Sequence, residues 1–212
     1  MTIEVQRGYA KGRAKRKQIL EAAMALFGEV GYRSASLREI AARCGLSHPG
    51  LLHHFASKEL LLSAVLEHRD AVDSDRYALT AGSGVEQLGR LVDLVAHNAE
   101  VPGIVELYAA LSTEAVAADH PAHAFFVRRY AQSRARMTNS FTLAEAQGAL
   151  RPGIRPEQAA VVLIAVMDGL QVQWLLDRRS VDMATTLRAH LADLLTVPLP
   201  GATGPRAPTP SA

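Results

Sequence analysis

Residues 36–58 constrain the fold most, because two helix-start signals and one helix-stop signal fall within this short stretch. Ser36 precedes Glu39 by three positions, ahead of apolar residues, which is the pattern of a capping box at a helix N-terminus. Gly45 predicts the end of that helix, and Ser47 followed by Pro49 predicts the start of a second one. Two short helices joined by a tight glycine turn are the layout of a helix-turn-helix, whose second helix enters the major groove of DNA.

The residues before this motif predict a longer helix. Between Arg13 and Val30 the apolar residues recur at the three-and-four spacing of one helical face, and Gly31 ends the pattern. The first turns of the second short helix, from His48 onwards, contain no carboxylate. Such a surface suits close approach to base edges and phosphates.

The charge is divided unevenly along the chain. Residues 1–58 hold ten Lys or Arg against four Glu, whereas residues 59–212 hold thirteen against seventeen acidic residues. A basic front end and an acidic body are typical of a protein that offers one end to a polyanion. A solvated N-terminal tail is the alternative; we favour DNA because six basic residues within 7–17 directly precede the motif. The sequence therefore predicts a basic flexible arm over residues 1–12.

Three segments carry a family resemblance over roughly residues 16–62: ILEAAMALFGEVGY, SLREIAARCGLS and LLHHFASKELLL. Together they resemble the DNA-binding domain of the TetR family of transcriptional regulators. The resemblance implies an all-α fold, with an N-terminal three-helix helix-turn-helix DNA-binding domain over residues 13–57. It also implies a larger C-terminal helical domain for ligand binding and dimerisation over residues 58–197.

The resemblance also implies which residues contact DNA. The expected base contacts come from Arg38, His48, Pro49, Gly50 and His53, and the expected phosphate contacts from Ser36, His54 and Lys58. Two further positions of the motif complete the predicted interface: Ser47, and Leu52, which stands where the family most often has a tyrosine that reaches a phosphate. For Arg38 the alternative is a surface ion pair, and for Lys58 it is a side chain that faces solvent.

Glycine and proline punctuation divides the rest of the chain into helices. The predicted helices span residues 58–80, 85–100, 103–118, 121–146, 156–177 and 182–195. The proline-rich stretch 198–212 has no apolar face and is predicted to be disordered.

The predicted helix over residues 156–177 indicates a homodimer. Its segment Ala159–Met167 is apolar on every side, so it must be buried all round, and a small helical domain covers only one side. The predicted dimer interface comprises Val162, Val166, Gly169, Leu170, Gln173, Leu187, Leu191 and Leu194. A twofold pair of heads would bind successive major grooves, so the partner is double-stranded DNA with a near-palindromic operator. The alternative is the central core helix of a monomer.

Polar and aromatic residues within the apolar helices are candidates for a site that binds a small apolar or amphipathic ligand. They are His97, Tyr108, Phe125, Phe126, Tyr130, Met167, Asp168, Gln171 and Trp174. Ordinary core packing is the alternative for each of them, because aromatic residues at helical spacing are common in protein cores.

Other classes of protein are disfavoured. His120 and His123 are three apart, but no further ligand completes a metal set, and no nucleophile or phosphate-loop motif is present. We expect no cofactor, no metal, no enzyme activity and no membrane segment, and the single Cys44 fits a reducing cytoplasm. The favoured function is a repressor released from its operator by a small molecule. The alternatives are an activator, a sequence-independent DNA-binding protein, or a helical carrier or enzyme with a vestigial head.

Overall fold

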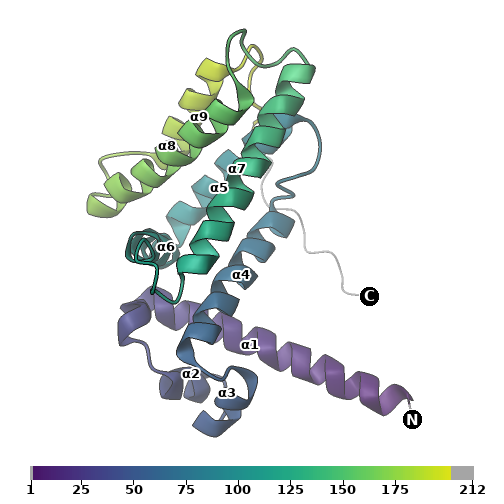
Figure 1. Ribbon diagram of the computed structural model, residues 1–212, viewed down its shortest axis with the longest axis vertical. Helices are drawn as coiled ribbons and strands as arrows, with labels where there is room; N and C mark the ends of the chain where they lie inside the picture. Colours follow the sequence, from purple (N-terminus) through teal and green to yellow (C-terminus); the bar gives the residue numbers. More distant parts are fainter. Residues whose placement is uncertain (1, 202–212) are drawn as a thin grey trace. The chain divides into compact units, whose positions relative to one another are not determined.

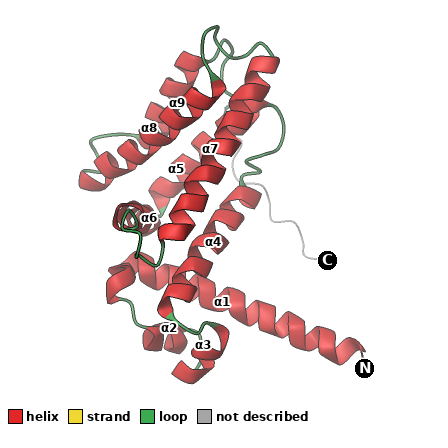
Figure 2. Cartoon of the chain, viewed as in Figure 1, coloured by secondary structure: helices red, strands yellow, loops and turns green. Residues whose placement is uncertain are grey.

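The computed structural model describes residues 2–201, and this part of the chain is helical (Figures 1 and 2). Its helices are α1 Thr2–Ser34, α2 Leu37–Arg43, α3 His48–His54, α4 Lys58–Arg76, α5 Gly84–Glu100, α6 Pro102–Glu114, α7 His123–Ala146, α8 Pro156–Leu176 and α9 Met183–Leu194. Within the described residues, extended backbone pairs only at an isolated antiparallel bridge between Leu150 and Leu195. The predicted all-α class is confirmed.

The N-terminal helix is longer than the sequence predicts. Its α1 begins at Thr2, so the arm predicted over residues 1–12 is helical wherever it is described. No proline interrupts these residues, and extending an existing helix gains one hydrogen bond for each residue fixed. At the other end, Gly31 has φ 77° and ψ 161°, so regular helical geometry breaks where the pattern stops.

The described residues form two compact units. The first comprises the described part of Met1–Arg69 together with Glu106–Phe125. Apolar residues of α1 to α4 fill its core: Ile19, Leu20, Ala23, Leu26, Phe27, Ile40, Leu51, Phe55, Leu61, Leu62, Val65 and Leu66 are buried. The sequence places the boundary after residue 57, whereas the compact units divide after Arg69, within the continuous helix α4.

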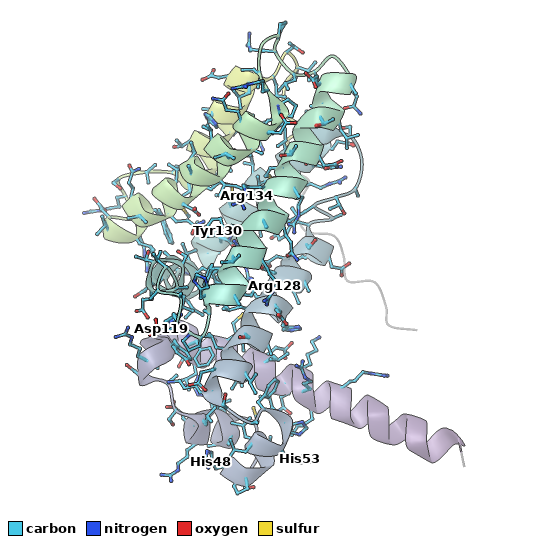
Figure 3. The ribbon with its side chains drawn as sticks, in the orientation of Figure 1. His48, His53, Asp119, Arg128, Tyr130 and Arg134 are labelled. Carbon is cyan, nitrogen blue, oxygen red and sulfur yellow. The ribbon has the colours of Figure 1, made fainter. Side chains whose placement is uncertain are left out.

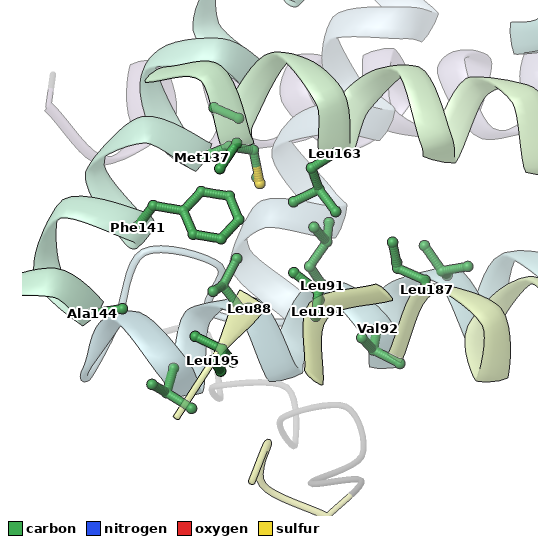
Figure 4. Close-up of a cluster of buried hydrophobic side chains, with 14 of the residues drawn as sticks. Leu88, Leu91, Val92, Met137, Phe141, Ala144, Leu163, Leu187, Leu191 and Leu195 are labelled. Carbon is green, nitrogen blue, oxygen red and sulfur yellow. The ribbon is translucent and has the colours of Figure 1, made fainter. Parts of the chain in front are cut away.

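The second unit comprises Asp70–Val105 and the described part of Phe126–Ala212. In it α9 packs against both α5 and α8, around a core that includes Leu88, Phe141, Leu163 and Leu187 (Figure 4). A complete capping box formed by Ser83 and Glu86 starts α5. The sequence carries this Ser-x-x-Glu signal as well.

Gly84, the first residue of α5, marks a close approach to α7. A Cβ atom built on it would lie 2.2 Å from the carbonyl oxygen of Ser140 and 2.5 Å from the backbone nitrogen of Ala144. Only glycine therefore fits at this crossing without a shift of backbone.

The segment after α9 is ordered where it is described. The Arg188 guanidinium donates to the carbonyl oxygen of Pro200 at 2.8 Å, and Leu199 packs against the core. Residues 198–201 thus depart from the predicted disorder, because Arg188 binds the Pro200 carbonyl and Leu199 offers an apolar side chain to the core. Residues 202–212 lie outside the described part.

The helix α8 is long and apolar enough to span a bilayer, with a mean hydropathy of 1.8 over its best window. The apolar run Ala159–Met167 covers only part of this helix, so it gives too low a value for the apolar length of α8. One such helix is weak evidence, because core helices pass the same test. Five of its residues are buried in the core of the second unit: Ala159, Ala160, Leu163, Leu170 and Trp174.

Candidate DNA interface and ligand cavity

The turn between α2 and α3 has the geometry that the motif requires. Gly45 has φ 63°, in the left-handed region, and its backbone N–H donates to the carbonyl of Ala42 at 3.0 Å. The N–H of Leu46 donates to the carbonyl of Ala41 at 2.9 Å, which completes a Schellman motif. The carbonyl of Cys44 accepts from the Lys15 ammonium at 2.8 Å, so α1 also secures the end of α2.

Serine caps start both short helices as predicted. The hydroxyl of Ser36 accepts from the backbone of Glu39 at 3.1 Å, and that of Ser47 accepts from Gly50 at 3.2 Å. The first box is only half formed, because the Glu39 carboxylate accepts from Arg43 at 3.0 Å. Arg43 also pairs with both carboxylate oxygens of Glu29 at 2.8 and 2.7 Å, which ties α2 to α1.

Arg38 lies exposed on α2, and it forms no hydrogen bond or ion pair with the described part of the chain. Its neighbours in sequence differ: Arg33 pairs with Glu114 at 3.3 Å, and Arg43 is held by two glutamates. The alternative for Arg38, a surface ion pair, is thus not formed with the described side chains of residues 12–201, and its guanidinium is available to a ligand.

The predicted contact residues of α3 lie on the accessible side of the helix. Leu51 is fully buried and anchors α3 in the first unit, whereas Pro49 and His53 are exposed (Figure 3 labels His48 and His53). The remaining predicted contacts are half-buried: His48, Gly50, Leu52 and His54. The surface that α3 offers is therefore made of imidazole, proline and glycine.

Lys58 is engaged within the first unit. Its ammonium donates to the carbonyl of Arg33 at 3.0 Å and lies 4.6 Å from the centre of the Tyr32 ring. Burial lowers the pKa of Lys58, and burial beside the Glu59 carboxylate raises the pKa of Tyr32 to about 12. Lys58 joins the end of α1 to the start of α4, and its phosphate contact stays a prediction.

The second unit holds a cavity of about 130 Å³ between α4, α5, α7 and α8. By the roughly 10–15 Å³ that one water needs, this space holds about ten waters. Four of the nine predicted ligand residues line it: Tyr130, Met167, Asp168 and Gln171. Its apolar wall includes Leu91, Leu94, Val95 and Ile164, and its polar lining includes Asp70, Asp73, Asn98, Arg129 and Arg136.

Two polar contacts organise the cavity wall. The Tyr130 hydroxyl, on α7 (Figure 3), donates to the Asp168 carboxylate at 2.9 Å, and Arg129 Nε donates to the Asp70 carboxylate at 2.9 Å. Burial raises the pKa of Asp168, although the Tyr130 hydroxyl opposes the shift. Burial also lowers the pKa of Arg136, which Asp70 attracts and Arg129 repels.

The other five predicted ligand residues do not line this cavity. The His97 ring lies beside Tyr77 and 3.0 Å from the Glu100 carboxylate. In the first unit the Tyr108 hydroxyl donates to the Leu66 carbonyl. The others, Phe125, Phe126 and Trp174, are buried, which is the core alternative weighed for them.

The structure divides the predicted dimer interface. Leu170, Leu187 and Leu191 are buried in the core of the second unit, so they are unavailable to another subunit. The prediction was wrong for these three because periodicity groups residues on a face without showing what covers it. The rest stay accessible: Val162 and Gln173 are exposed, and Val166, Gly169 and Leu194 are half-buried.

A second cavity, of about 240 Å³, lies beside α8 and α9. His190, Val162 and Leu194 line it. In the described part of the chain, His190 Nε2 is the one buried side-chain nitrogen or oxygen without a hydrogen-bond partner.

The histidines weighed as metal ligands are otherwise occupied. His120 Nδ1 accepts from the backbone of Ala122, and His123 Nδ1 lies 2.7 Å from the carbonyl oxygen of Ala115. Within the described residues no group of three His, Cys, Asp or Glu side chains is placed to hold a metal ion.

The geometry of α2 and α3 defines a helix-turn-helix DNA-binding protein. Residues 19–65 match the family described as bacterial regulatory proteins, tetR family, and residues 85–196 match the BetI-type transcriptional repressor, C-terminal. The chain therefore belongs to the TetR family of transcriptional regulators, with a C-terminal domain of the BetI type, which confirms the resemblance.

Individual relatives agree with this assignment. The chain is 28% identical over 183 residues to the HTH-type transcriptional regulator BetI of Escherichia coli (strain UMN026), covering 83% of this chain and 91% of that protein. Over 51 residues it is 45% identical to the regulator UidR of Escherichia coli K12, covering 24% and 26%. A transcriptional regulator from Saccharomonospora viridis, solved in complex with choline, shares the fold with a TM-score of 0.71 at 24% identity, covering 86% and 98%.

Proposed function

We propose that the chain is a homodimeric cytoplasmic repressor that binds a near-palindromic operator and is released by a small molecule. The main support for a small-molecule ligand is the cavity of about 130 Å³ in the second unit, which is lined by apolar side chains and by charged groups. Such a composition suits small-molecule binding. The match of residues 85–196 to BetI-type repressors supports repression, and the choline complex of the similar structure supports a ligand.

The head supports sequence-specific DNA binding. Arg38 carries an exposed guanidinium without an ion pair to the described side chains of residues 12–201, and a guanidinium recognises guanine through two hydrogen bonds. His48 and His53 add hydrogen-bonding groups on α3, and no carboxylate lies on that helix to repel phosphates.

The exposed face of α8 supports the dimer. Val162, Val172 and Leu176 are 43%, 51% and 84% exposed, and they recur on one side of the helix together with Gly169. No described atom lies within 4 Å of a Cβ built on Gly169, so a second backbone has room to approach there. An apolar stripe of this kind is typical of an interface between subunits.

Selection of bound DNA from a random pool with the purified chain tests the proposal. We expect an inverted repeat with half-sites about one helical turn apart. Arg38→Ala should weaken binding to that site by about 1–3 kcal/mol and relax one base position. The matched control is Arg179→Ala, which removes an exposed arginine of the second unit. Recovery of no preferred sequence, or of a single half-site by a monomer, would overturn it.

A further inference from the structure

The cavity of the second unit contains two guanidinium groups, and only one of them, that of Arg129, is paired with Asp70. Asp70 forms its close contact with Arg129, whose Nε lies 3.2 and 2.9 Å from the two carboxylate oxygens. Arg136 lies near both, attracted by Asp70 and repelled by Arg129, but within the described residues its guanidinium forms no hydrogen bond or ion pair.

The free donors of Arg136 are open to the cavity. Arg136 lines the cavity and is half-buried. Among the described residues, the one fully buried side-chain nitrogen or oxygen without a hydrogen-bond partner belongs to His190, so the unpaired Arg136 nitrogens remain accessible. Arg136 has lost part of its hydration, and the Asp70 carboxylate that attracts it is already hydrogen-bonded to Arg129. A ligand carboxylate would stabilise the guanidinium through paired N–H···O bonds.

The other charged side chains that line the cavity are less suited than Arg136 to bind a charged group of a ligand. Asp70 and Asp73 both have partners within the protein. Asp168 accepts from Tyr130, and its burial favours the neutral form. Recognition of a quaternary ammonium typically uses an aromatic cage, whereas Tyr130 is the one aromatic side chain among the described lining residues.

We propose that the effector is an amphipathic monoanion, whose carboxylate pairs with Arg136 and whose apolar part lies along Leu91, Leu94, Ile164 and Met167. This inference rests on the proposed function, since it names the ligand class of the same cavity. The volume suits a molecule of about ten non-hydrogen atoms, by the space each water needs.

Three probes of matched length test the charge: octanoate, octanamide and octylammonium. Binding is measured by calorimetry and by the shift of the thermal unfolding midpoint on the full chain. We expect octanoate to bind and raise the midpoint, octanamide to bind about tenfold or more weakly, and octylammonium to have no effect. Tighter binding of octylammonium than of octanoate, or no octanoate binding, overturns the inference.

Arg136→Gln should weaken octanoate binding by about tenfold or more, whereas Arg136→Lys, which keeps the charge, should retain part of it. The matched control is Arg134→Gln, on the same helix (Figure 3), because Arg134 is exposed and does not line the cavity. Equal octanoate affinity in Arg136→Gln and in the unchanged protein would also overturn the inference.

Operator release, followed by fluorescence anisotropy, separates the two proposals. If octanoate binds through Arg136 without loosening operator DNA, the ligand class stands and ligand-released repression fails. If octylammonium alone releases the DNA, repression by release stands and the anionic class fails.

Discussion

Replacing Gly84 with alanine should destabilise the second unit, although alanine is ordinarily the better helix former. The added Cβ would lie 2.2 Å from the Ser140 oxygen and 2.5 Å from the Ala144 nitrogen, against the 3.4 Å at which ordinary contact begins. Both neighbours are backbone atoms of α7, so no side chain can rotate away. The two helices must therefore separate by about 1 Å.

The magnitude follows from two opposing terms. Overpacking of a filled core costs about 1–3 kcal/mol, and a clash with backbone belongs at the upper end of that range. Alanine has a higher helix propensity than glycine, which should stabilise α5 by up to about 1 kcal/mol. We therefore expect a net loss of about 2 kcal/mol, which lowers the unfolding midpoint by about 4–8 °C in a chain of this size.

Thermal and urea unfolding at one fixed protomer concentration would measure this loss, because the proposed dimer would make the unfolding midpoint depend on concentration. The matched control is Gly12→Ala in α1, since a Cβ there meets no described atom within 4 Å and alanine should add up to about 1 kcal/mol of helix stability. If Gly84→Ala were as stable as the unchanged protein, the close approach of α5 to α7 would be refuted.

Substitutions at three further residues test individual side chains of the second unit. Asp168→Asn should stabilise the protein increasingly as pH rises, because burial raises the pKa of Asp168 and its ionisation costs stability above that pKa; a pH-independent difference in urea unfolding would contradict this. Asp182→Ala should cost about 1 kcal/mol at neutral pH by removing the cap of α9. Hydrogen bonds from Thr185 lower the pKa of Asp182, so this cost should fade as pH falls through that pKa, whereas Asp182→Asn should keep the cap. His190→Leu should raise the free energy of unfolding by about 1 kcal/mol by removing the partnerless Nε2, and a loss of stability would show that this nitrogen has a partner in solution.

The sequence predicted the starts of α4, α8 and α9 well because local chemistry marks them. The predicted helices over 58–80 and 103–118 extend four residues beyond the ends of α4 and α6, and α7 begins two residues after the predicted start at Pro121. The start of α4 at Lys58 and of α8 at Pro156 agree with the predictions, and α9 starts one residue after the predicted Asp182, which caps it. The predicted start of the first helix at Arg13 was wrong. A pattern of apolar residues marks only the packed part of a helix, and α1 begins earlier, at Thr2.

The residues that line the candidate ligand cavity were predicted only in part, for a physical reason. Tyr130 and Asp168 stood out as polar groups within apolar surroundings, and both line the cavity. Asp70, Arg129 and Arg136 also line it, but they lie on amphipathic helices, where charged residues normally face solvent. Only the crossing of α4 with α7 shows that their charges meet, and no spacing along the chain encodes it.

Asp70 and Asp73 of the cavity wall lie on the same unbroken helix as Leu61 and Leu62 of the first unit's core. With a rise of 1.5 Å per residue, the 19 residues of α4 span about 28 Å of helical backbone, so one helix carries residues of both units. Binding linkage then works in both directions. If an effector lowers the affinity for the operator by some factor, the operator must lower the affinity for the effector by the same factor. Titration of the DNA-bound protein with the effector would therefore measure the coupling free energy between the two sites.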